Sequence, residues 1–88
     1  MNPQAVLQER YPNANLDKLD IYFLHLDACR TEKGLDTHEH HICPKKQFPE
    51  YAKGCPENLI TLKIDDHVWA HKLLEDACGV KAPPTRWD

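Results

Sequence analysis

The four cysteines of this 88-residue chain are too widely spaced to form a C-x-x-C pair. A zinc site made of four cysteines usually needs at least one close pair, so such a site is disfavoured. No apolar run approaches the roughly 18 residues of a membrane span, and "MNPQAVLQER" lacks the layout of a signal peptide. We therefore expect a cytoplasmic protein, in which reduced cysteines serve as small buried apolar groups rather than disulfides.

The chain also lacks internal repeats, low-complexity tracts and an excess of positive charge. Its formal net charge is −3, which by itself speaks against a nucleic-acid partner. That negative balance belongs to residues 1–39, whereas residues 40–81 carry equal numbers of acidic and basic side chains. Apolar residues make up 41% of the chain and charged residues 28%, which is typical of one small globular domain rather than of a disordered segment.

Residues 1–34 are predicted to form a helical segment. Asn2 can cap a first helix, which Pro12 must end. Asn15 can cap a second helix, which we expect to continue as far as Gly34. Apolar residues recur at spacings of three and four along the second helix, and this stripe consists of Leu16, Leu19, Phe23, Leu26 and Cys29.

Residues 35–80 follow a different pattern, and together with the helices they predict an α+β fold. A short extended stretch over 35–46 leads into an irregular loop, and "NLITLKI" is typical of a second strand. A third helix over 67–78 should begin after a cap at Asp65 and Asp66 and end at Gly79. The two prolines of residues 81–88 predict an extended C-terminal tail.

Histidines cluster at two places in this second part of the chain. His67 and His71 are four residues apart, so they share one face of the expected helix and can hold one metal ion. Such a pair is a weak signal, because a packing face continued by Leu74 and Cys78 explains it equally well. The second cluster, "HEHHICPK" at 38–45, can fold back against that face in a strand-strand-helix unit.

Residues 40–74 resemble the HNH endonuclease superfamily, whose core is a ββα-metal finger. The matching elements are His40, "HICP" beginning at His41, "NL" beginning at Asn58, and His67 nine residues after that asparagine. "PENLITL" and "AHKLL" also look like free-standing homing endonucleases of phages, and the additional helix histidine is similar to colicin-type nucleases. The resemblance implies a ββα-metal nuclease core over 35–80.

The resemblance also implies a role for each matching residue. His41 would be the general base, since an ordinary imidazole titrates near about pH 6.5 and is largely neutral at pH 7. Asn58 would pin the loop between the strands, whose backbone would then hold the ring of His41. His40, His67 and His71 would ligate one divalent cation; three imidazoles favour zinc or nickel, while magnesium or manganese could also support activity.

Several residues keep a plain alternative beside the functional interpretation. Adjacent strand residues point to opposite faces, so His40 and His41 divide the work or are two unrelated strand histidines. His38 is a candidate substitute ligand or phosphate contact, although a solvated side chain is the simpler expectation. We expect His25 to be structural or exposed to solvent, and Trp69 to belong to the core rather than to stack on bases.

The chain departs from the family pattern at three points. The loop after the first strand lacks the frequent Gly-Gly, and the structural zinc ribbon of many relatives is missing. No arginine matches the catalytic arginine that precedes the histidines. Candidate contacts to DNA phosphates are therefore Arg30, Lys45, Lys46 and His38.

The resulting hypothesis is a metal-dependent DNA endonuclease of a bacterium or a phage-infected cell, leaving 5′-phosphate and 3′-hydroxyl ends. A monomer would nick DNA, and a homodimer formed through the N-terminal helices would cut both strands. Homing, or toxin action with an immunity or targeting partner, would use the same chemistry. The alternative from another class is a non-catalytic, metal-stabilised module that binds DNA or protein on the same scaffold.

Overall fold

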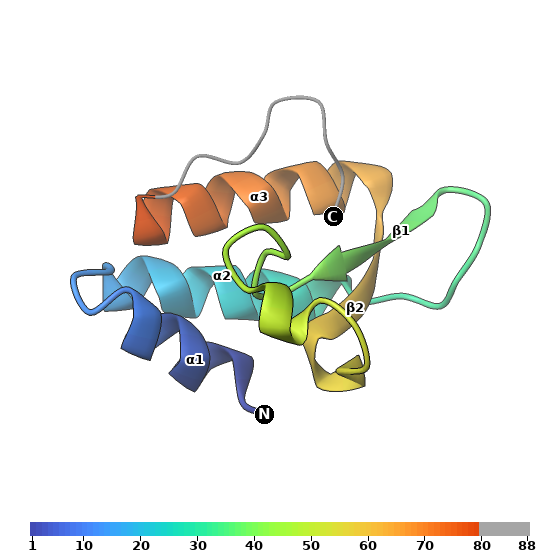
Figure 1. The fold of residues 1–88 in the computed structure, drawn as a ribbon. Helices are drawn as coiled ribbons and strands as arrows, with labels where there is room; N and C mark the ends of the chain where they lie inside the picture. Colours follow the sequence, from blue (N-terminus) through green and yellow to red (C-terminus); the bar gives the residue numbers. More distant parts are fainter. Residues whose placement is uncertain (80–88) are drawn as a thin grey trace.

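Three helices and a two-stranded antiparallel sheet make up the computed structural model, which describes residues 1–79 and bears out the α+β prediction. The expected tail at 81–88 lies outside the described residues. In chain order the elements are α1 (Pro3–Arg10), α2 (Leu16–Cys29), β1 (Thr37–His41), two short 3-10 turns (Pro49–Tyr51 and Pro56–Asn58), β2 (Leu59–Lys63) and α3 (Ile64–Cys78) (Figure 1).

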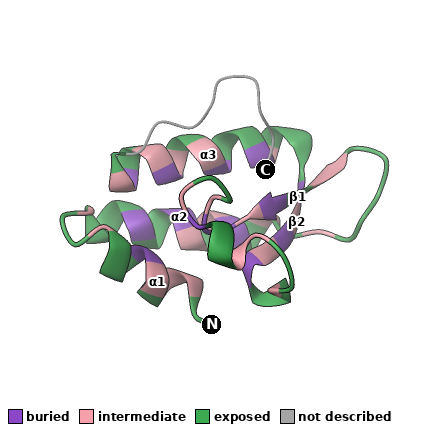
Figure 2. Cartoon of the chain, in the orientation of Figure 1, coloured by how far each residue is buried: buried purple, intermediate pink, exposed green. Residues whose placement is uncertain are grey.

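Helices α2 and α3 run antiparallel and side by side (Figure 1). Two hydrogen bonds mark this direction: the Asn15 amide donates to the Ala77 carbonyl over 2.9 Å, and a His25 ring nitrogen lies 2.9 Å from the Asp66 carbonyl. Buried positions line the facing sides of both helices and continue onto the hairpin (Figure 2). The core consists of Leu7, Leu19, Tyr22, Leu26, Ile42, Cys43, Phe48, Ile60, Leu62, Ala70, Leu74 and Ala77.

The predicted asparagine caps of the first two helices are confirmed. The side chain of Asn2 accepts hydrogen bonds from two amides of α1, and that of Asn15 accepts one from the Lys18 amide. The cap predicted for α3 is wrong, because this helix begins at Ile64 and holds Asp65 and Asp66 inside its first turn. Carboxylates are favoured there by the positive end of the helix dipole.

The predicted C-terminus of the second helix is also wrong. Helix α2 ends at Cys29 instead of continuing to Gly34. Beyond it, Arg30 forms a bridge with Leu62 of β2, and the Thr31 amide donates to the Thr61 carbonyl over 3.0 Å. The chain leaves the helix at this point because the free edge of β2 offers backbone partners that helix propensity cannot foresee. At the other end of the fold, α3 ends as expected at Gly79, which has φ of 71°.

The predicted apolar stripe of α2 is only partly correct. Leu19 and Leu26 are buried and Phe23 and Cys29 pack against the core, but Leu16 is exposed. Tyr22 takes the central buried position instead, which keeps the spacing of three and four with Leu19 and Leu26.

Strands β1 and β2 form the expected hairpin, with His40 opposite Ile60 and His41 opposite Leu59. Residues 42–58 connect the two strands as a loop. Because side chains alternate along a strand, His38 and His40 share one face of β1 while Glu39 and His41 share the other. The hairpin lies beside the two long helices (Figure 1), so one face of β1 is turned towards α3.

All four cysteines are free thiols, and only Cys43 is fully buried. The expectation that the cysteines are buried apolar groups holds fully for this one of the four. Burial raises the pKa of the Cys43 thiol from 9.0 to about 12. Among residues 1–79, no helix is both long enough and apolar enough to span a membrane.

Candidate functional site

Three histidines from β1 and α3 meet in the interior of the protein. His40 and His67 are fully buried and His71 is half-buried. Each offers one ring nitrogen such that the three atoms lie within 4.8 Å of one another. The Nε2 atoms of His67 and His71, one helical turn apart, are separated by 3.1 Å. The predicted convergence of two distant segments of the chain is therefore present.

Tyr22 of α2 orients the ring of His40 from behind. The tyrosine hydroxyl donates its one proton to the Ile42 carbonyl over 2.9 Å and lies 2.7 Å from Nε2 of His40. Because that proton is already used, the hydroxyl oxygen accepts a hydrogen bond from a protonated Nε2. The other nitrogen of His40, Nδ1, is buried and carries the lone pair of a neutral ring. A metal-binding histidine is typically oriented in this way by a partner on its second nitrogen.

His38 contacts the same cluster, which corrects the expectation of a solvated side chain. It is half-buried, and its Nδ1 lies 3.2 Å from Nδ1 of His67. The shared face of His38 and His40 follows from strand alternation, but the contact with α3 requires the tertiary fold. With Nδ1 of His67 engaged by His38, Nε2 of His67 faces His71.

The arrangement fits a divalent cation in both distance and donor chemistry. Two nitrogens bound to a tetrahedral zinc ion at about 2.0–2.1 Å stand about 3.3 Å apart, close to the 3.1 Å between His67 and His71. Imidazoles are ligands for zinc, nickel, cobalt and copper, whereas magnesium prefers oxygen. His40, His67 and His71 can therefore hold one metal ion. Their imidazole donors favour a transition metal over magnesium but do not identify which transition metal binds.

His41, on the opposite face of β1, faces the loop between the strands. Its Nε2 lies 3.2 Å from the Ala52 carbonyl, to which a protonated Nε2 donates. Its Nδ1 is buried and has no hydrogen-bond partner among residues 1–79. Such a nitrogen costs stability, on the order of 1–3 kcal/mol, and one left in a native structure calls for an explanation such as a functional role.

Asn58 pins the loop that carries Ala52. Its side-chain oxygen accepts from the Cys43 amide over 2.7 Å, and its side-chain nitrogen donates to the carbonyls of Cys43 and Tyr51 over 3.0 and 3.2 Å. The side chain is fully buried, so these bonds are protected from water. Because Tyr51 precedes Ala52, Asn58 holds the backbone group that in turn contacts His41.

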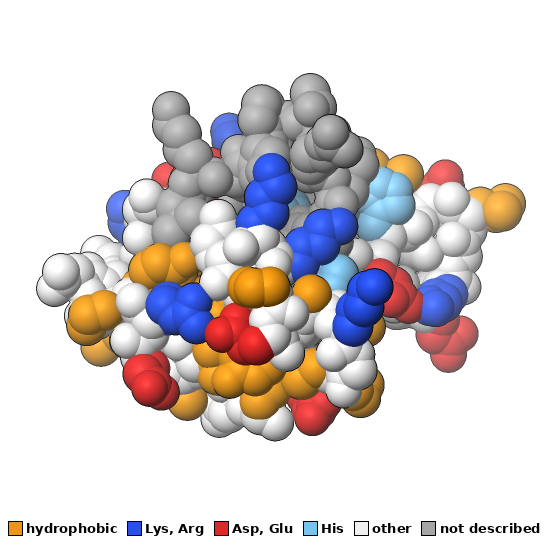
Figure 3. All heavy atoms as spheres, in the orientation of Figure 1, with side chains coloured by type: hydrophobic (Ala, Val, Ile, Leu, Met, Phe, Trp, Pro, Cys, Tyr) orange, Lys and Arg blue, Asp and Glu red, His pale blue; other side chains and the backbone are white. Residues whose placement is uncertain are grey.

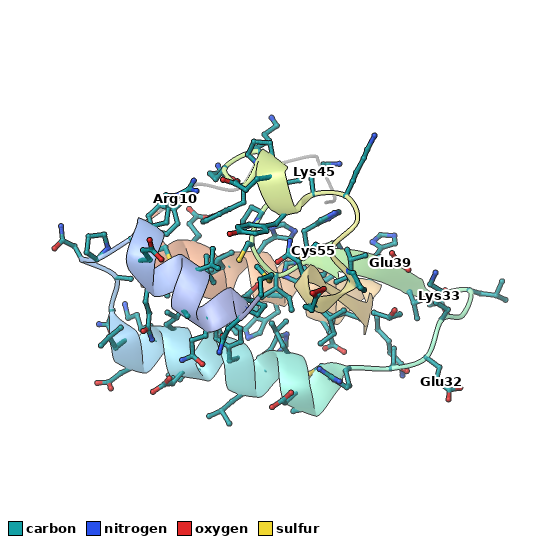
Figure 4. The ribbon with its side chains drawn as sticks, turned by 60° about the horizontal axis from the view of Figure 1, so that its bottom comes forward. Arg10, Glu32, Lys33, Glu39, Lys45 and Cys55 are labelled. Atoms are coloured by element: carbon teal, nitrogen blue, oxygen red, sulfur yellow. The ribbon has the colours of Figure 1, made fainter. Side chains whose placement is uncertain are left out.

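The candidate phosphate contacts fall into two places. Lys45 and Lys46 are exposed on the loop just after β1, and Figure 4 labels Lys45 there. Figure 3 shows lysine and arginine side chains around histidine atoms on one face of the molecule. Arg30 lies across β2 from β1, and its guanidinium pairs with Asp27 of α2 over 3.7 Å. Lys45 and Lys46 therefore belong to the loop after β1, whereas Arg30 lies beyond β2.

Two aromatic residues differ from expectation. Trp69 is 53% exposed, with the Lys72 ammonium 5.8 Å from its ring centroid, so its predicted place in the core is wrong. Tyr22 was missed as a partner of His40. Its position within the buried spacing of α2 was the available signal, but only the folded chain brings that position to the sheet.

No protein-family model, no curated protein and no solved structure matches this chain. The arguments that follow therefore depend on the geometry of its own residues. Membership of residues 40–74 in the HNH superfamily remains a hypothesis.

Proposed function

We propose that the chain is a metal-dependent DNA endonuclease of the HNH type, with a ββα-metal core formed by β1, β2 and α3. The observation that carries this proposal is the pairing of two environments on adjacent residues. His40 belongs to a three-histidine cluster suited to a cation, while His41 is held by a loop carbonyl outside that cluster. A site that only stabilises the fold needs the first environment and has no use for the second.

His41 is the proposed general base. With Nε2–H donated to the Ala52 carbonyl, a neutral ring has its lone pair on Nδ1. This atom is buried in the protein without DNA, so the proposal requires the loop to move when DNA binds, after which Nδ1 can take a proton from an attacking water. The water oxygen forms a bond to phosphorus, and the bond from phosphorus to the 3′ oxygen breaks. The 3′ oxygen leaves with the electron pair and gains a proton from solvent, to which His41 returns the proton that it took, so the products carry 5′-phosphate and 3′-hydroxyl ends.

His40, His67 and His71 are the proposed cation ligands. A divalent cation bound there would supply positive charge next to the phosphate oxygens and the departing oxygen, which is the usual contribution of a metal to phosphodiester hydrolysis. Three protein ligands leave coordination positions for phosphate and water. Lys45 and Lys46, exposed on the adjoining loop, are the proposed contacts to neighbouring phosphates.

DNA is the proposed partner. The protein would recognise DNA with little sequence specificity, or with the help of a targeting protein. A monomer would nick one strand. Ile21 and Leu24 expose apolar surface on α2, the face that a homodimer through the N-terminal helices would use to cut both strands. A targeting or immunity protein would act on the same chemistry and change only where or when cutting occurs.

The proposal is tested by cleavage of supercoiled plasmid. Wild-type protein is incubated with plasmid and magnesium, manganese, nickel or zinc, beside His41→Ala and a control variant, Glu39→Gln. Glu39 shares the strand face of His41 but is exposed and pairs with Lys33 (Figure 4). We expect nicking by wild type and Glu39→Gln, and a loss on the order of 10²-fold or more in His41→Ala.

Metal titrations of the same three proteins decide between the enzyme and its alternative. If all three bind metal and none cuts DNA, the chain is a metal-stabilised binding module instead. If His41→Ala cuts as well as wild type, the activity belongs to a contaminant or to another residue.

A further inference from the structure

A second cluster of metal-ligating residues lies at the junction of α2 and α3, apart from the three-histidine cluster. It contains His25 and Cys29 from the last two turns of α2 and Asp66 from the first turn of α3. One ligand atom from each lies within 4.8 Å of the other two. All three side chains are half-buried, so a cation from solvent can reach them.

The ring of His25 is already oriented as a metal ligand would be. Its Nε2 lies 2.9 Å from the backbone carbonyl of Asp66, an acceptor only, so Nε2 carries the proton of a neutral ring. Nδ1 therefore has the lone pair. Histidines that bind metals usually donate their second nitrogen to a carboxylate or a backbone carbonyl in this manner.

Nδ1 of His25 and Sγ of Cys29 are separated by 3.6 Å. Their spacing of four residues places both on one face of α2. At a tetrahedral zinc ion, with about 2.0–2.1 Å to nitrogen and about 2.3 Å to sulfur, these two atoms would stand about 3.6 Å apart. The pair therefore has the separation required of two ligands of one ion.

Asp66 completes the set from the other helix. Its carboxylate lies within 4.8 Å of the ligand atoms of His25 and Cys29, and burial together with the charge of this carboxylate raises the pKa of the Cys29 thiol. The same residue thus orients His25 through its carbonyl and meets Cys29 through its side chain. Sequence considerations assigned Asp66 to a helix cap, a role that the fold gives to Lys63.

We propose that His25 Nδ1, Cys29 Sγ and the Asp66 carboxylate form a second site for a divalent transition-metal ion such as zinc. Nitrogen, sulfur and oxygen donors together suit zinc or cobalt and disfavour magnesium and calcium. The bound ion joins the end of α2 to the start of α3 (Figure 1), next to His67. Such a cross-link between two helices adds stability, which a domain of this length often obtains from a disulfide or a metal ion.

Cobalt(II) titration tests the second site directly, because its spectrum reports whether a thiolate is bound. The three-histidine cluster contains no sulfur, so a thiolate-to-cobalt charge-transfer band can come only from a site with cysteine. Wild-type protein kept in a phosphine reductant should bind two cobalt ions per chain, one for each cluster, and show this band. Cys29→Ser should bind one ion and lose the band.

Cys55→Ser is the matched control. Cys55 is also half-buried and lies 3.6 Å from a carboxylate, that of Glu57, but no histidine belongs to that pair. Cys55→Ser should keep both ions and the band. His71→Ala should keep the band while the three-histidine cluster weakens, so the two sites, which share no residue, are tested independently of each other and of DNA cleavage.

A single cobalt ion per wild-type chain without the band overturns the proposal, as does a band that persists in Cys29→Ser. Circular dichroism of each variant shows whether it folds. Should Cys29→Ser unfold, Asp66→Asn provides the second variant, because it removes a charged ligand and retains the backbone carbonyl that orients His25. The Asp66→Asn variant should bind the cobalt ion that gives the thiolate charge-transfer band at least about 10-fold more weakly than wild type. An unchanged affinity for this ion contradicts the assignment of Asp66 as a ligand.

Discussion

The two faces of β1 place adjacent histidines in different surroundings. On the inner face, His40 is fully buried against α3, and its ring is oriented by Tyr22. On the outer face, His41 is half-buried and contacts a loop carbonyl. A step of one residue along a strand turns a side chain to the opposite side, so a two-residue motif can serve two sites at once.

The histidines on the two faces are held in position by different kinds of groups. The inner face is supported by side chains from α2 and α3, which are held by core packing. The outer face is supported by backbone groups of the loop 42–58, which depend on Asn58 for their position. We therefore expect changes on the inner face to act on metal binding, and changes on the outer face to act on cleavage.

The largest effect is expected from a pair of variants, one that removes a histidine of the metal cluster and one that removes the histidine of the outer face. His71→Ala removes a proposed ligand and should weaken cation binding by more than the roughly 10–100-fold typical of losing a supporting partner. It should also abolish plasmid nicking. His41→Ala should abolish nicking while binding stays within about 2-fold of wild type. Competition titration against a chelator measures both affinities, and equal loss of binding in the two variants removes the distinction.

Asn58→Ala tests the support of the outer face. The substitution leaves the Cys43 amide and the carbonyls of Cys43 and Tyr51 without their buried partner. We expect the free energy of unfolding to fall by roughly 2–4 kcal/mol, as measured by urea denaturation of the metal-free protein. Asn58→Asp keeps the acceptor but loses both donated bonds. Its free energy of unfolding should therefore lie between those of wild type and Asn58→Ala, or fall below both. A change below about 0.5 kcal/mol in Asn58→Ala would mean that the loop is held by other contacts.

Tyr22→Phe tests the support of the inner face with one oxygen atom. Its loss removes the partner of His40 Nε2 and the bond to the Ile42 carbonyl. Cation affinity should fall about 10–100-fold, as is usual when a ligand loses its orienting partner. Stability should fall by about 1–2 kcal/mol. Unaltered affinity with lowered stability would show that Tyr22 supports the core alone.

Alkaline titration has no effect at neutral pH and acts where the loop meets α1, at the contact between the Cys43 thiol and the Pro3 carbonyl. Burial raises the pKa of Cys43 from 9.0 to about 12, so the folded protein holds this thiol neutral while the unfolded chain loses the proton first. The stabilising contribution is therefore complete below about pH 9 and is lost as the pH rises to about 12. Cys43→Ala should flatten this decline in urea titrations at successive pH values. An equal slope in the variant assigns the decline to other groups.

Local signals in the sequence were sufficient for much of the fold. Asparagine caps, Pro12 and the αL glycine at Gly79 act within a few residues of the helix ends that they determine, so these ends could be predicted. The spacing of His67 and His71 and the two faces of β1 follow from helix and strand periodicity. Each of these features depends on neighbours along the chain.

Features that depend on distant partners could not be predicted. Helix α2 ends early because Arg30 and Thr31 pair with β2, which is about thirty residues away. Tyr22 becomes the partner of His40 only after α2 packs beside the hairpin. The cluster of His25, Cys29 and Asp66 likewise joins two helices, and its spacing within α2 alone carries no signal of the third residue.

The most direct test of the central claim is a crystal structure of the protein loaded with zinc or manganese, read by anomalous scattering. The account predicts an anomalous peak bound by His40, His67 and His71, with Nδ1 of His41 outside its coordination sphere. A peak coordinated by His41, or three histidines that hold no ion under saturating metal, would contradict it.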